Sequence, residues 1–307
     1  YIAFLRKALT DCGMDHIPII PFFISAGETG ESGFEFTGNM LRKAIMAAYY
    51  GDALMRLLHR VRPYELVEGS ANALAEEWTE KGKRALKKGG VIQFDKTLLA
   101  MIRAFDKLPL TSETKRKPRV GLVGEIMLKY HPDANNEAAK IVEQEGGEAV
   151  VPDIMDFVLY CLYDRIFAYE QLAGKWKPYM IGLLSIATLE FCRLTMRIGL
   201  GLSKRFTAPC SFRTLRKKTR GLISMGHQTG EGWLLTAEMV KMLEADVPNI
   251  LCMQPFGCLP NHITAKGWLK ELKNRFPDAN IVAVDYDPGA SEVNQINRIK
   301  LMMSVAK

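Results

Sequence analysis

Residues 119–151 constrain the fold more than any other part of the sequence. The apolar run RVGLVGEI at 119–126 has the length and composition of a buried strand, and Ala149–Val151 is a second such run. Between them, Asn135-Asn136 predict the start of a helix and Gly146-Gly147 its end. Two strands joined by a helix need a crossover connection, so they are expected to lie parallel in one sheet. The sequence therefore predicts an α/β fold.

The same alternation of strand and helix continues to the end of the chain. Three further apolar runs predict strands, at Leu222–Met225, Asn249–Cys252 and Ile281–Val284. Helices are predicted after them, at Trp233–Leu243, at Ile263–Arg275 and from about Ser291. Residues 154–206 are predicted to be a mostly helical insertion between the second and third strands. We therefore expect residues 116–307 to form one lobe, with a parallel sheet and helices on both faces.

The first 115 residues follow a different pattern. A helix is predicted at 1–12, then a strand at Ile17–Ile24 and a loop at 25–38. Apolar residues at three- and four-residue spacing predict three more helices, at 37–61, about 70–88 and about 94–106. The polar segment 111–118 ends in proline, so we place a domain boundary there. Residues 1–115 are expected to be the end of a truncated α/β lobe plus a helical bridge. Because the chain opens without a first strand for that lobe, we expect it to be the C-terminal piece of a longer protein.

The chain is basic, with a formal net charge of +7 and an isoelectric point near 9.0. Lys and Arg gather in three stretches, Lys81–Lys88, Lys115–Arg119 and Arg213–Arg220. Solvated helix faces are the simplest interpretation, and a phosphate-rich small molecule such as coenzyme A is the second. Nucleic acid is not expected as a partner, because no recognition motif or interleaved aromatic residues accompany the charge.

The composition is typical of a soluble globular protein, with 48% hydrophobic and 24% charged residues. The six cysteines are scattered along the chain, which argues against a disulfide framework and favours reduced thiols in the cytoplasm. No membrane segment is expected, because the most apolar region, Tyr179–Leu202, is interrupted by Glu190, Arg193 and Arg197.

The main candidate site is the strand-to-helix turn at 249–267, which contains two thiols (Cys252, Cys258), one imidazole (His262) and two amides (Gln254, Asn261). Ligands of open α/β sheets bind beyond the carboxyl ends of the strands, and soft sulfur ligands suit a metal or an iron–sulfur cluster. The spacing Cys-x5-Cys-x3-His matches neither the C-x2-C zinc pattern nor a ferredoxin run. A free cysteine also packs as a small apolar residue, and this alternative stays open, above all for Cys252 on the strand.

Three other predicted strand ends carry candidate residues. Glu125 ends the first strand, and the glycine-rich turn GHQTGEG at 226–232 contains Gln228, Gly230 and Glu231. Backbone N–H groups of such a turn can bind an anion at a helix N-terminus, although a plain tight turn is the alternative. Glu231 is either an acid–base residue or a carboxylate that stabilises the helix N-terminus. The pair Asp285-x-Asp287 suits a divalent cation or an ordinary turn.

Four segments resemble the 2-hydroxyacyl-CoA dehydratase superfamily, and within it the branch described as acyl-CoA dehydratase activase-related. These segments are VGEIMLKYHPDANN (123–136), GHQTGEGWLLTAEM (226–239), NILCMQPFGCLPNH (249–262) and DYDPGASEVNQINRIKLM (285–302). The resemblance runs through nearly the whole chain. It implies Rossmann-like lobes with helical insertions, of which this chain would hold the last.

The resemblance also implies a chemistry, a cofactor and partners. Proteins of this superfamily hold an iron–sulfur cluster, either 4Fe–4S or double-cubane, and an ATP-dependent activase supplies an electron for loss of water from a 2-hydroxyacyl-CoA. Cys258 matches the late cluster cysteine, and Cys252 is a possible extra ligand. Glu231, His262 or Glu125 would handle protons or position the thioester, and Gln228, Gly230 and Gln254 would contact the bound group. The earlier cluster cysteines would precede Tyr1, so the present chain alone is expected to carry no cluster and to be inactive.

Two other hypotheses stay open from the sequence. The chain is either a regulatory or electron-relay module without a substrate of its own, or a domain in which Cys252, Cys258 and His262 hold a structural zinc ion. The acyl group and the oligomeric state do not follow from the sequence.

Overall fold

The computed structural model describes residues 2–19, 37–111, 116–287, 289 and 291–306. The chain divides into two compact units, Tyr1–Ala44 and Ile45–Lys307. The division therefore does not fall at the expected boundary near residue 115. Within the second unit, the helical residues 45–106 share one core with the later insertion, since Tyr50, Phe94 and Tyr163 belong to the same buried cluster.

The first unit contains helix α1 (Ile2–Asp11), which ends before Gly13 with its positive φ of 69°. This agrees with the predicted helix at 1–12. The predicted strand at Ile17–Ile24 and the loop at 25–38 fall mostly on residues 20–36, outside the described residues.

A layer of long helices opens the second unit. The predicted helices at 37–61, about 70–88 and about 94–106 are confirmed as α2 (Gly38–Val61), α3 (Ser70–Lys88) and α4 (Val91–Asp106). Gly89, with a φ of 80°, ends α3 in a left-handed conformation that glycine adopts easily. Aromatic packing joins α2 to α4, where the Tyr50 and Phe94 rings lie 5.3 Å apart.

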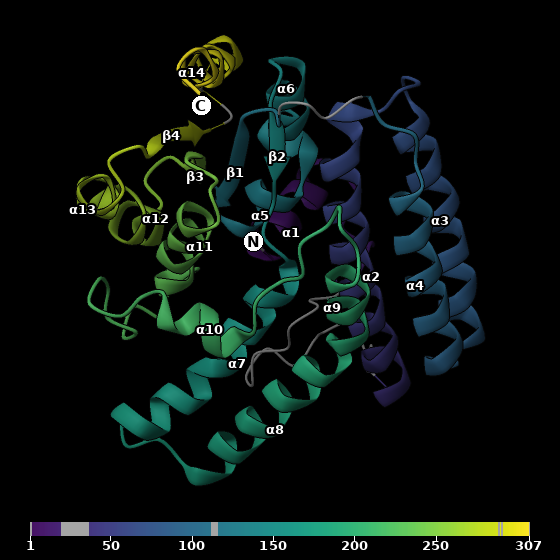
Figure 1. Ribbon diagram of the computed structural model, residues 1–307. Helices are drawn as coiled ribbons and strands as arrows, with labels where there is room; N and C mark the ends of the chain where they lie inside the picture. The colour runs from purple at the N-terminus through teal and green to yellow at the C-terminus, as the bar shows by residue number, and fades with distance from the viewer. Residues whose placement is uncertain (1, 20–36, 112–115, 288, 290, 307) are drawn as a thin grey trace. The chain divides into compact units, whose positions relative to one another are not determined.

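The sheet has four parallel strands in the order β2-β1-β3-β4 (Figure 1). The strands are β1 (Arg119–Gly124), β2 (Glu148–Val150), β3 (Asn249–Pro255) and β4 (Asn280–Tyr286). The predicted α/β class and the parallel β1–α–β2 unit are thus confirmed. The fold of this unit is Rossmann-like.

Helices cover both faces of the sheet because its strands alternate. In β3, Leu251 and Met253 pack into one apolar cluster, while Ile250 and Cys252 pack into another. The first cluster is closed by α5 (Ile126–Tyr130), α6 (Ala138–Gln144) and α14 (Glu292–Ser304). The second is closed by α11 (Gly232–Glu244) and α13 (Leu269–Arg275). Burial on both faces explains why β3 reads as a continuous apolar run.

Two sequence predictions in this region are wrong. Leu222–Met225 is not a strand, because the backbone N–H groups of Leu222 and Ile223 both donate to the carbonyl of Thr219 in a turn. Ile223 is buried in the helical core rather than in the sheet. The helix expected at Ile263–Arg275 is broken, since α12 (Leu259–Thr264) ends before the 3-10 turn η3 (Lys266–Trp268) and α13 follows.

The insertion is helical, as predicted. It consists of α7 (Ile154–Gln171), α8 (Trp176–Cys192) and α9 (Leu194–Gly201), followed after a coil by α10 (Phe212–Lys217). Within the described residues, the stretch Trp176–Gly201 is long and apolar enough to cross a membrane, with 22% of its most apolar window buried. Arg193 in this stretch is fully buried and donates to Asp153 and Asp156, both at 2.9 Å.

Candidate functional site

The sheet reverses its strand order between β1 and β3. The chain passes from β1 to β2 on one side, whereas β3 and β4 lie on the other. A crevice forms outside the carboxyl ends of two strands at such a switch point, and ligands of open α/β sheets bind there. Glu125 directly follows β1 and Cys258 lies three residues after β3, so the structure places both at this edge.

Glu231 connects three loops at the edge. Its Oε1 accepts a hydrogen bond of 2.9 Å from the backbone N–H of Ile126, and its Oε2 accepts one of 3.3 Å from Nδ2 of Asn261. The residue is 4% exposed, and burial raises the pKa of its carboxyl group. A carboxyl group whose protonated form is favoured in this way is suited to acid–base chemistry.

Asn261 links Glu231 to the thiol of Cys258. The same Nδ2 lies 3.1 Å from Sγ of Cys258, so a carboxylate, an amide and a thiol form a continuous chain of contacts. We call Glu125, Glu231, Cys258 and Asn261 the carboxyl-edge cluster. Sequence reasoning noticed Asn261 in the turn but assigned it no role, because the turn alone does not show that it contacts a carboxylate 30 residues earlier.

Within the described residues, the hydrogen bond of His262 is made to the backbone of Cys258 and not to its thiol. Its Nδ1 lies 2.9 Å from the backbone carbonyl oxygen of Cys258, so the ring is oriented by the backbone of its own turn. Glu125 has a local role as well, because its carboxylate accepts hydrogen bonds from the backbone N–H groups of Met127 and Leu128 and caps α5. Their catalytic roles stay predictions.

Gln254 lies at the same edge but contacts β4. Its Nε2 donates to Oδ1 of Asp285 at 2.6 Å, and Nζ of Lys266 approaches the same oxygen at 3.1 Å. Although burial acts to raise the pKa of Asp285, these two donors outweigh it and lower the pKa. Asp285 is thus engaged by a lysine, which disfavours its use as a cation ligand with Asp287.

The glycine-rich turn packs against the thiol-bearing turn. Gly230 has a φ of 61°, and a Cβ at this position would lie 2.9 Å from Cγ of Pro260. Glycine is therefore required both by the backbone conformation and by the close approach. The side chain of Gln228 is held by its own turn, since its Nε2 donates to the backbone carbonyl of Met225 at 2.6 Å.

Several buried polar atoms near this edge have no hydrogen-bond partner among the described residues. They include Oδ1 of Asn261 and the Oε1 atoms of Gln254 and Gln228. The hydroxyl of Tyr160 on α7 is another, and a Cβ on Gly232 would meet it. Unpaired polar groups are rare in protein interiors, so these atoms are available for hydrogen bonds to a polar ligand. The sequence did not indicate Tyr160 as a site residue, because it lies in the helical insertion and not at the end of a predicted strand.

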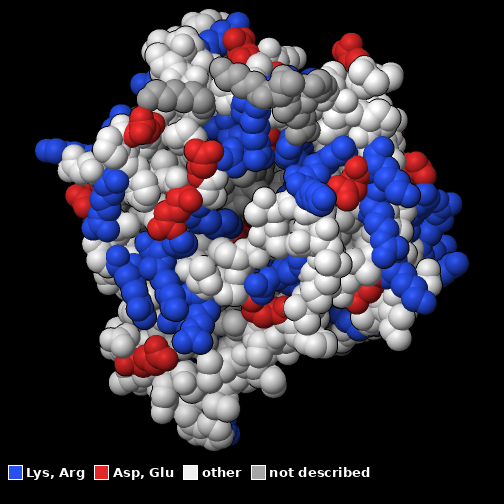
Figure 2. All heavy atoms as spheres, viewed as in Figure 1, with Lys and Arg blue, Asp and Glu red and all other residues white. Residues whose placement is uncertain are grey.

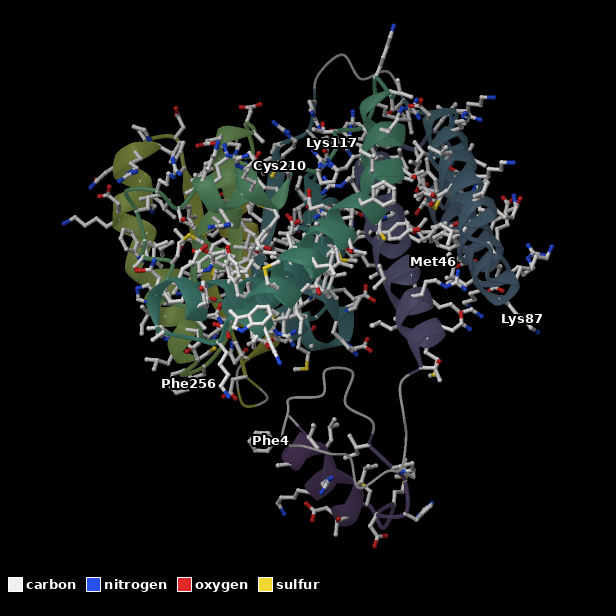
Figure 3. All side chains as sticks on the ribbon, turned by 90° about the horizontal axis from the view of Figure 1, so that it is seen from below. Phe4, Met46, Lys87, Lys117, Cys210 and Phe256 are labelled. Carbon is white, nitrogen blue, oxygen red and sulfur yellow. The ribbon has the colours of Figure 1, made fainter. Side chains whose placement is uncertain are left out.

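The two cysteines of β3 and its turn differ in environment. Cys252 is 0% exposed in an apolar cluster, and burial raises the pKa of its thiol to about 12. The thiolate that a metal requires is therefore disfavoured at Cys252, whereas packing explains its place. Cys258 is half-buried beside exposed apolar residues, of which Phe256 is 77% exposed and lies at the surface (Figure 3).

A further thiol lies within the electrostatic range of Glu231. Burial, followed by Asp164 and Glu231, raises the pKa of Cys161 on α7 to about 11. Part of the Cys161 residue is nevertheless exposed to solvent.

The described residues do not supply a complete metal site. They contain no group of three or more His, Cys, Asp or Glu side chains that could hold a metal ion. A zinc site made of Cys252, Cys258 and His262 is therefore not assembled. An iron–sulfur cluster with four thiolate ligands does not fit this chain alone either, since Cys258 is the one thiol found in the carboxyl-edge cluster.

Comparisons with known proteins give no further identification. No family model, no curated protein and no solved structure matches the chain.

Proposed function

We propose that the chain is the C-terminal part of a 2-hydroxyacyl-CoA dehydratase-like protein whose carboxyl-edge cluster faces the reaction centre. One observation carries this proposal: Glu231, Asn261 and Cys258 contact one another in series at the switch point of a parallel sheet. The resemblance of the segments that contain them supports the choice of chemistry. The proposed partners are an acyl-CoA thioester and an ATP-dependent activase, in the cytoplasm.

Cys258 contributes one thiolate in this proposal, and cysteines outside the present chain contribute the others. The flanking residues Phe256 and Leu259 are 77% and 68% exposed, which gives the turn an apolar surface for contact with another part of the full-length protein. The side-chain amide of Asn261 donates to the sulfur and fixes the position of the thiol in its turn. When bound, the cluster would supply the low-potential electron.

Glu231 holds a proton in this proposal. Burial favours its protonated form, and its Oε2 lies against Asn261 rather than against a cation. Oε2 could therefore release or accept a proton next to the thiolate ligand without leaving its loop. The backbone N–H of Ile126 fixes the orientation of the carboxyl group through Oε1.

The test uses the full-length protein, purified without oxygen. Cys258→Ala is expected to lower iron and sulfide per chain, while Cys252→Ala keeps both near the wild-type level because its thiol belongs to the core. Cys12→Ala, an exposed cysteine of the first unit, is the matched control. Circular dichroism checks that each variant is folded.

Equal iron in the wild type and in Cys258→Ala would contradict the proposal. Titration with an acyl-CoA by calorimetry separates it from the alternative of a relay or regulatory module, which would bind no thioester.

A further inference from the structure

A cavity of about 370 Å³ lies beside β2 and the amino end of β1, away from the carboxyl-edge cluster. We call it the basic cavity. Its volume is in the range of small-molecule sites, roughly 300–1,000 Å³. Lys and Arg side chains gather around a hollow on this face of the molecule (Figure 2). Its walls include cationic residues from α2, from the start of β1, from α11 and from the coil after α9, among them Arg56, Arg60, Arg119, Arg205 and Lys241.

Positive charge exceeds negative charge along the walls. Seven Lys and Arg side chains line the cavity against two carboxylates, Glu148 and Glu244. Glu148 is shared, since its oxygens lie 2.8 Å from Arg116 and 3.6 Å from Arg60. Among the described residues, Arg205 donates only to backbone carbonyl oxygens, those of Phe105 at 2.8 Å and Leu108 at 3.1 Å. Its charge therefore meets no carboxylate.

Two further cations of the cavity wall form ion pairs with buried carboxylates. Arg56 donates to Asp153 at 2.5 Å, and Lys241 donates to Asp156 at 3.1 Å. Both carboxylates also bind the fully buried Arg193, so they are divided among three cations. Burial acts to lower the pKa of Lys241, but its acidic neighbours, Asp156 above all, together outweigh burial and raise the pKa, which keeps the ammonium charged.

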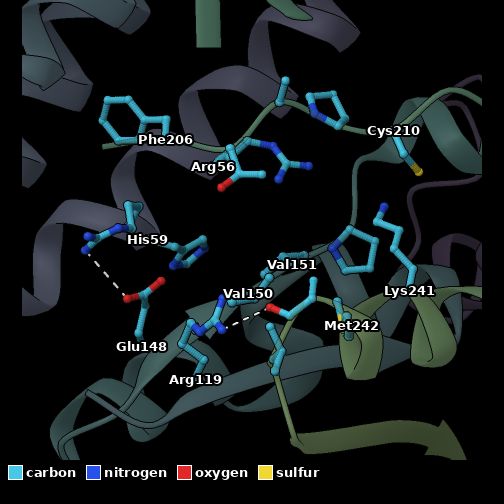
Figure 4. A pocket seen from close by; sticks show the side chains of 18 of the residues that line it. Arg56, His59, Arg119, Glu148, Val150, Val151, Phe206, Cys210, Lys241 and Met242 are labelled. Carbon is cyan, nitrogen blue, oxygen red and sulfur yellow. Dashed lines mark hydrogen bonds and ion pairs between the residues drawn. The ribbon is translucent and has the colours of Figure 1, made fainter. Parts of the chain in front are cut away.

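The remaining wall is apolar. Val150, Phe206, Met242 and Val247 line the cavity between the cations. In the close view, Arg56 and Phe206 lie on one side of the cavity and Val150 and Met242 on the other (Figure 4). An aromatic ring and a thioether offer contacts to a flat apolar group, whereas a small inorganic anion would leave this wall unused.

We propose that the basic cavity binds a nucleoside phosphate. Its phosphoryl oxygens would meet Arg56, Arg205 and Lys218, because guanidinium and ammonium groups make strong charge-assisted hydrogen bonds to phosphate. Lys218 is paired with Glu244 and would be shared between that carboxylate and the phosphate. Its base would pack between Phe206 and Met242. The basic cavity shares no residue with the carboxyl-edge cluster.

Calorimetric titration of the 307-residue chain with ADP tests the proposal, with adenosine and inorganic pyrophosphate as separate arms. ADP is expected to bind at one site, pyrophosphate to bind about tenfold more weakly, and adenosine not to bind. Arg205→Gln and Lys218→Gln should each weaken ADP binding about tenfold, the effect of losing one charged hydrogen bond.

The matched control is Arg275→Gln. Arg275 lies on α13, outside the cavity walls, and donates to the carbonyl of Gly221 at 2.6 Å, much as Arg205 does to Phe105. It should bind ADP like the wild type. Should Arg205→Gln not fold by circular dichroism, Lys218→Gln, whose side chain is partly exposed, provides the test. Absence of ADP binding, an equal loss in Arg275→Gln, or pyrophosphate binding as tight as ADP binding would overturn the proposal.

Discussion

The carboxyl-edge cluster differs from the charged groups at and next to the basic cavity in whether its ionisable side chains face opposite charges. We call the latter, namely Arg56, Asp153, Asp156, Arg193 and Lys241, the buried ion network. Every member of the network faces an opposite charge at 3.1 Å or less. In the cluster, the buried Glu231 accepts its hydrogen bonds from neutral donors, the backbone N–H of Ile126 and the side-chain amide of Asn261, and burial raises its pKa.

This difference suggests that the network contributes mainly to the stability of the fold and the cluster mainly to proton and ligand binding. A buried charge that loses its partner costs several kcal/mol, so the network is expected to hold α2, α7, α11 and the junction between α8 and α9 together. A buried carboxyl group with neutral partners is easily protonated, and unpaired amide oxygens remain available to a ligand. Substitutions in the network should therefore affect unfolding most, and substitutions in the cluster should affect proton and ligand binding.

The largest effect is expected for Arg193→Met. It leaves the buried carboxylates of Asp153 and Asp156 without their shared cation, so the free energy of unfolding should fall by about 3–5 kcal/mol. Denaturant unfolding at neutral pH measures the change. Arg275→Met, which breaks an exposed pair with Glu271, is the control and should cost less than about 1 kcal/mol. A similar loss in both variants would contradict the distinction.

The acid limb of the stability curve tests the same network. Burial acts to raise the pKa of Asp156, but Lys241 and Arg193 outweigh it and lower it to about 2. Its unfolded value is near 3.8, so this stabilisation is present above that pH and is lost as pH falls toward 2. The Arg193→Met variant should lose less stability than the wild type as the pH falls through this window, because Arg193 no longer lowers the pKa of Asp156.

A smaller loss, about 3 kcal/mol, is expected for Lys129→Met, which removes the partner of Glu238. Nζ of Lys129 lies 2.9 Å from both carboxylate oxygens, and both side chains are buried. Without the lysine, burial should raise the pKa of Glu238 further. The folded state then binds the proton more tightly than the unfolded state, so the variant should lose more stability at pH 8 than at pH 5. An equal loss at both values would contradict this account.

Glu231→Gln should have a modest effect on stability, about 1 kcal/mol. In the wild type the raised pKa of Glu231 makes stability fall as pH rises from the unfolded value of 4.5 through the folded one. The variant cannot titrate, so it should lack this part of the pH dependence. Unfolding curves of both proteins between pH 4 and pH 8 give the comparison, and parallel pH profiles would show that Glu231 is not the titrating group.

The smallest effects are expected at the two cysteines. Cys252→Ala should cost about 1 kcal/mol because it leaves a small gap in a packed core. Cys258→Ala should change stability by less than about 0.5 kcal/mol, since the half-buried thiol fills no core position. Thermal unfolding of the iron-free chain measures both. A larger loss for Cys258→Ala would assign that thiol a structural role.

The sequence by itself determined the elements that local chemistry dictates. Apolar periodicity predicted α2, α3, α4 and α11, and the strand–helix–strand pattern predicted the parallel pairing of β1 with β2. It also predicted that Glu125 and Cys258 belong to one edge, because the carboxyl ends of parallel strands meet there. Glu231 was expected at this edge as the end of a strand at Leu222–Met225, which the structure does not contain, and its hydrogen bond from Ile126 places it there instead. The spacing of apolar residues, every second residue in a strand and every 3.6 residues in a helix, is a local property of the sequence. It can be recognised without knowing which elements pack against the segment.

Only the tertiary structure decided the rest. The run Leu222–Met225 has the composition of a strand, but its first residues form a turn on the carbonyl of Thr219, and Ile223 is buried among helices instead. The contact of Asn261 with Glu231, the ion pairs of Arg193 and the basic cavity all join residues far apart in the chain. Such contacts depend on how helices pack around the sheet, and no local pattern encodes the partner of a buried charge.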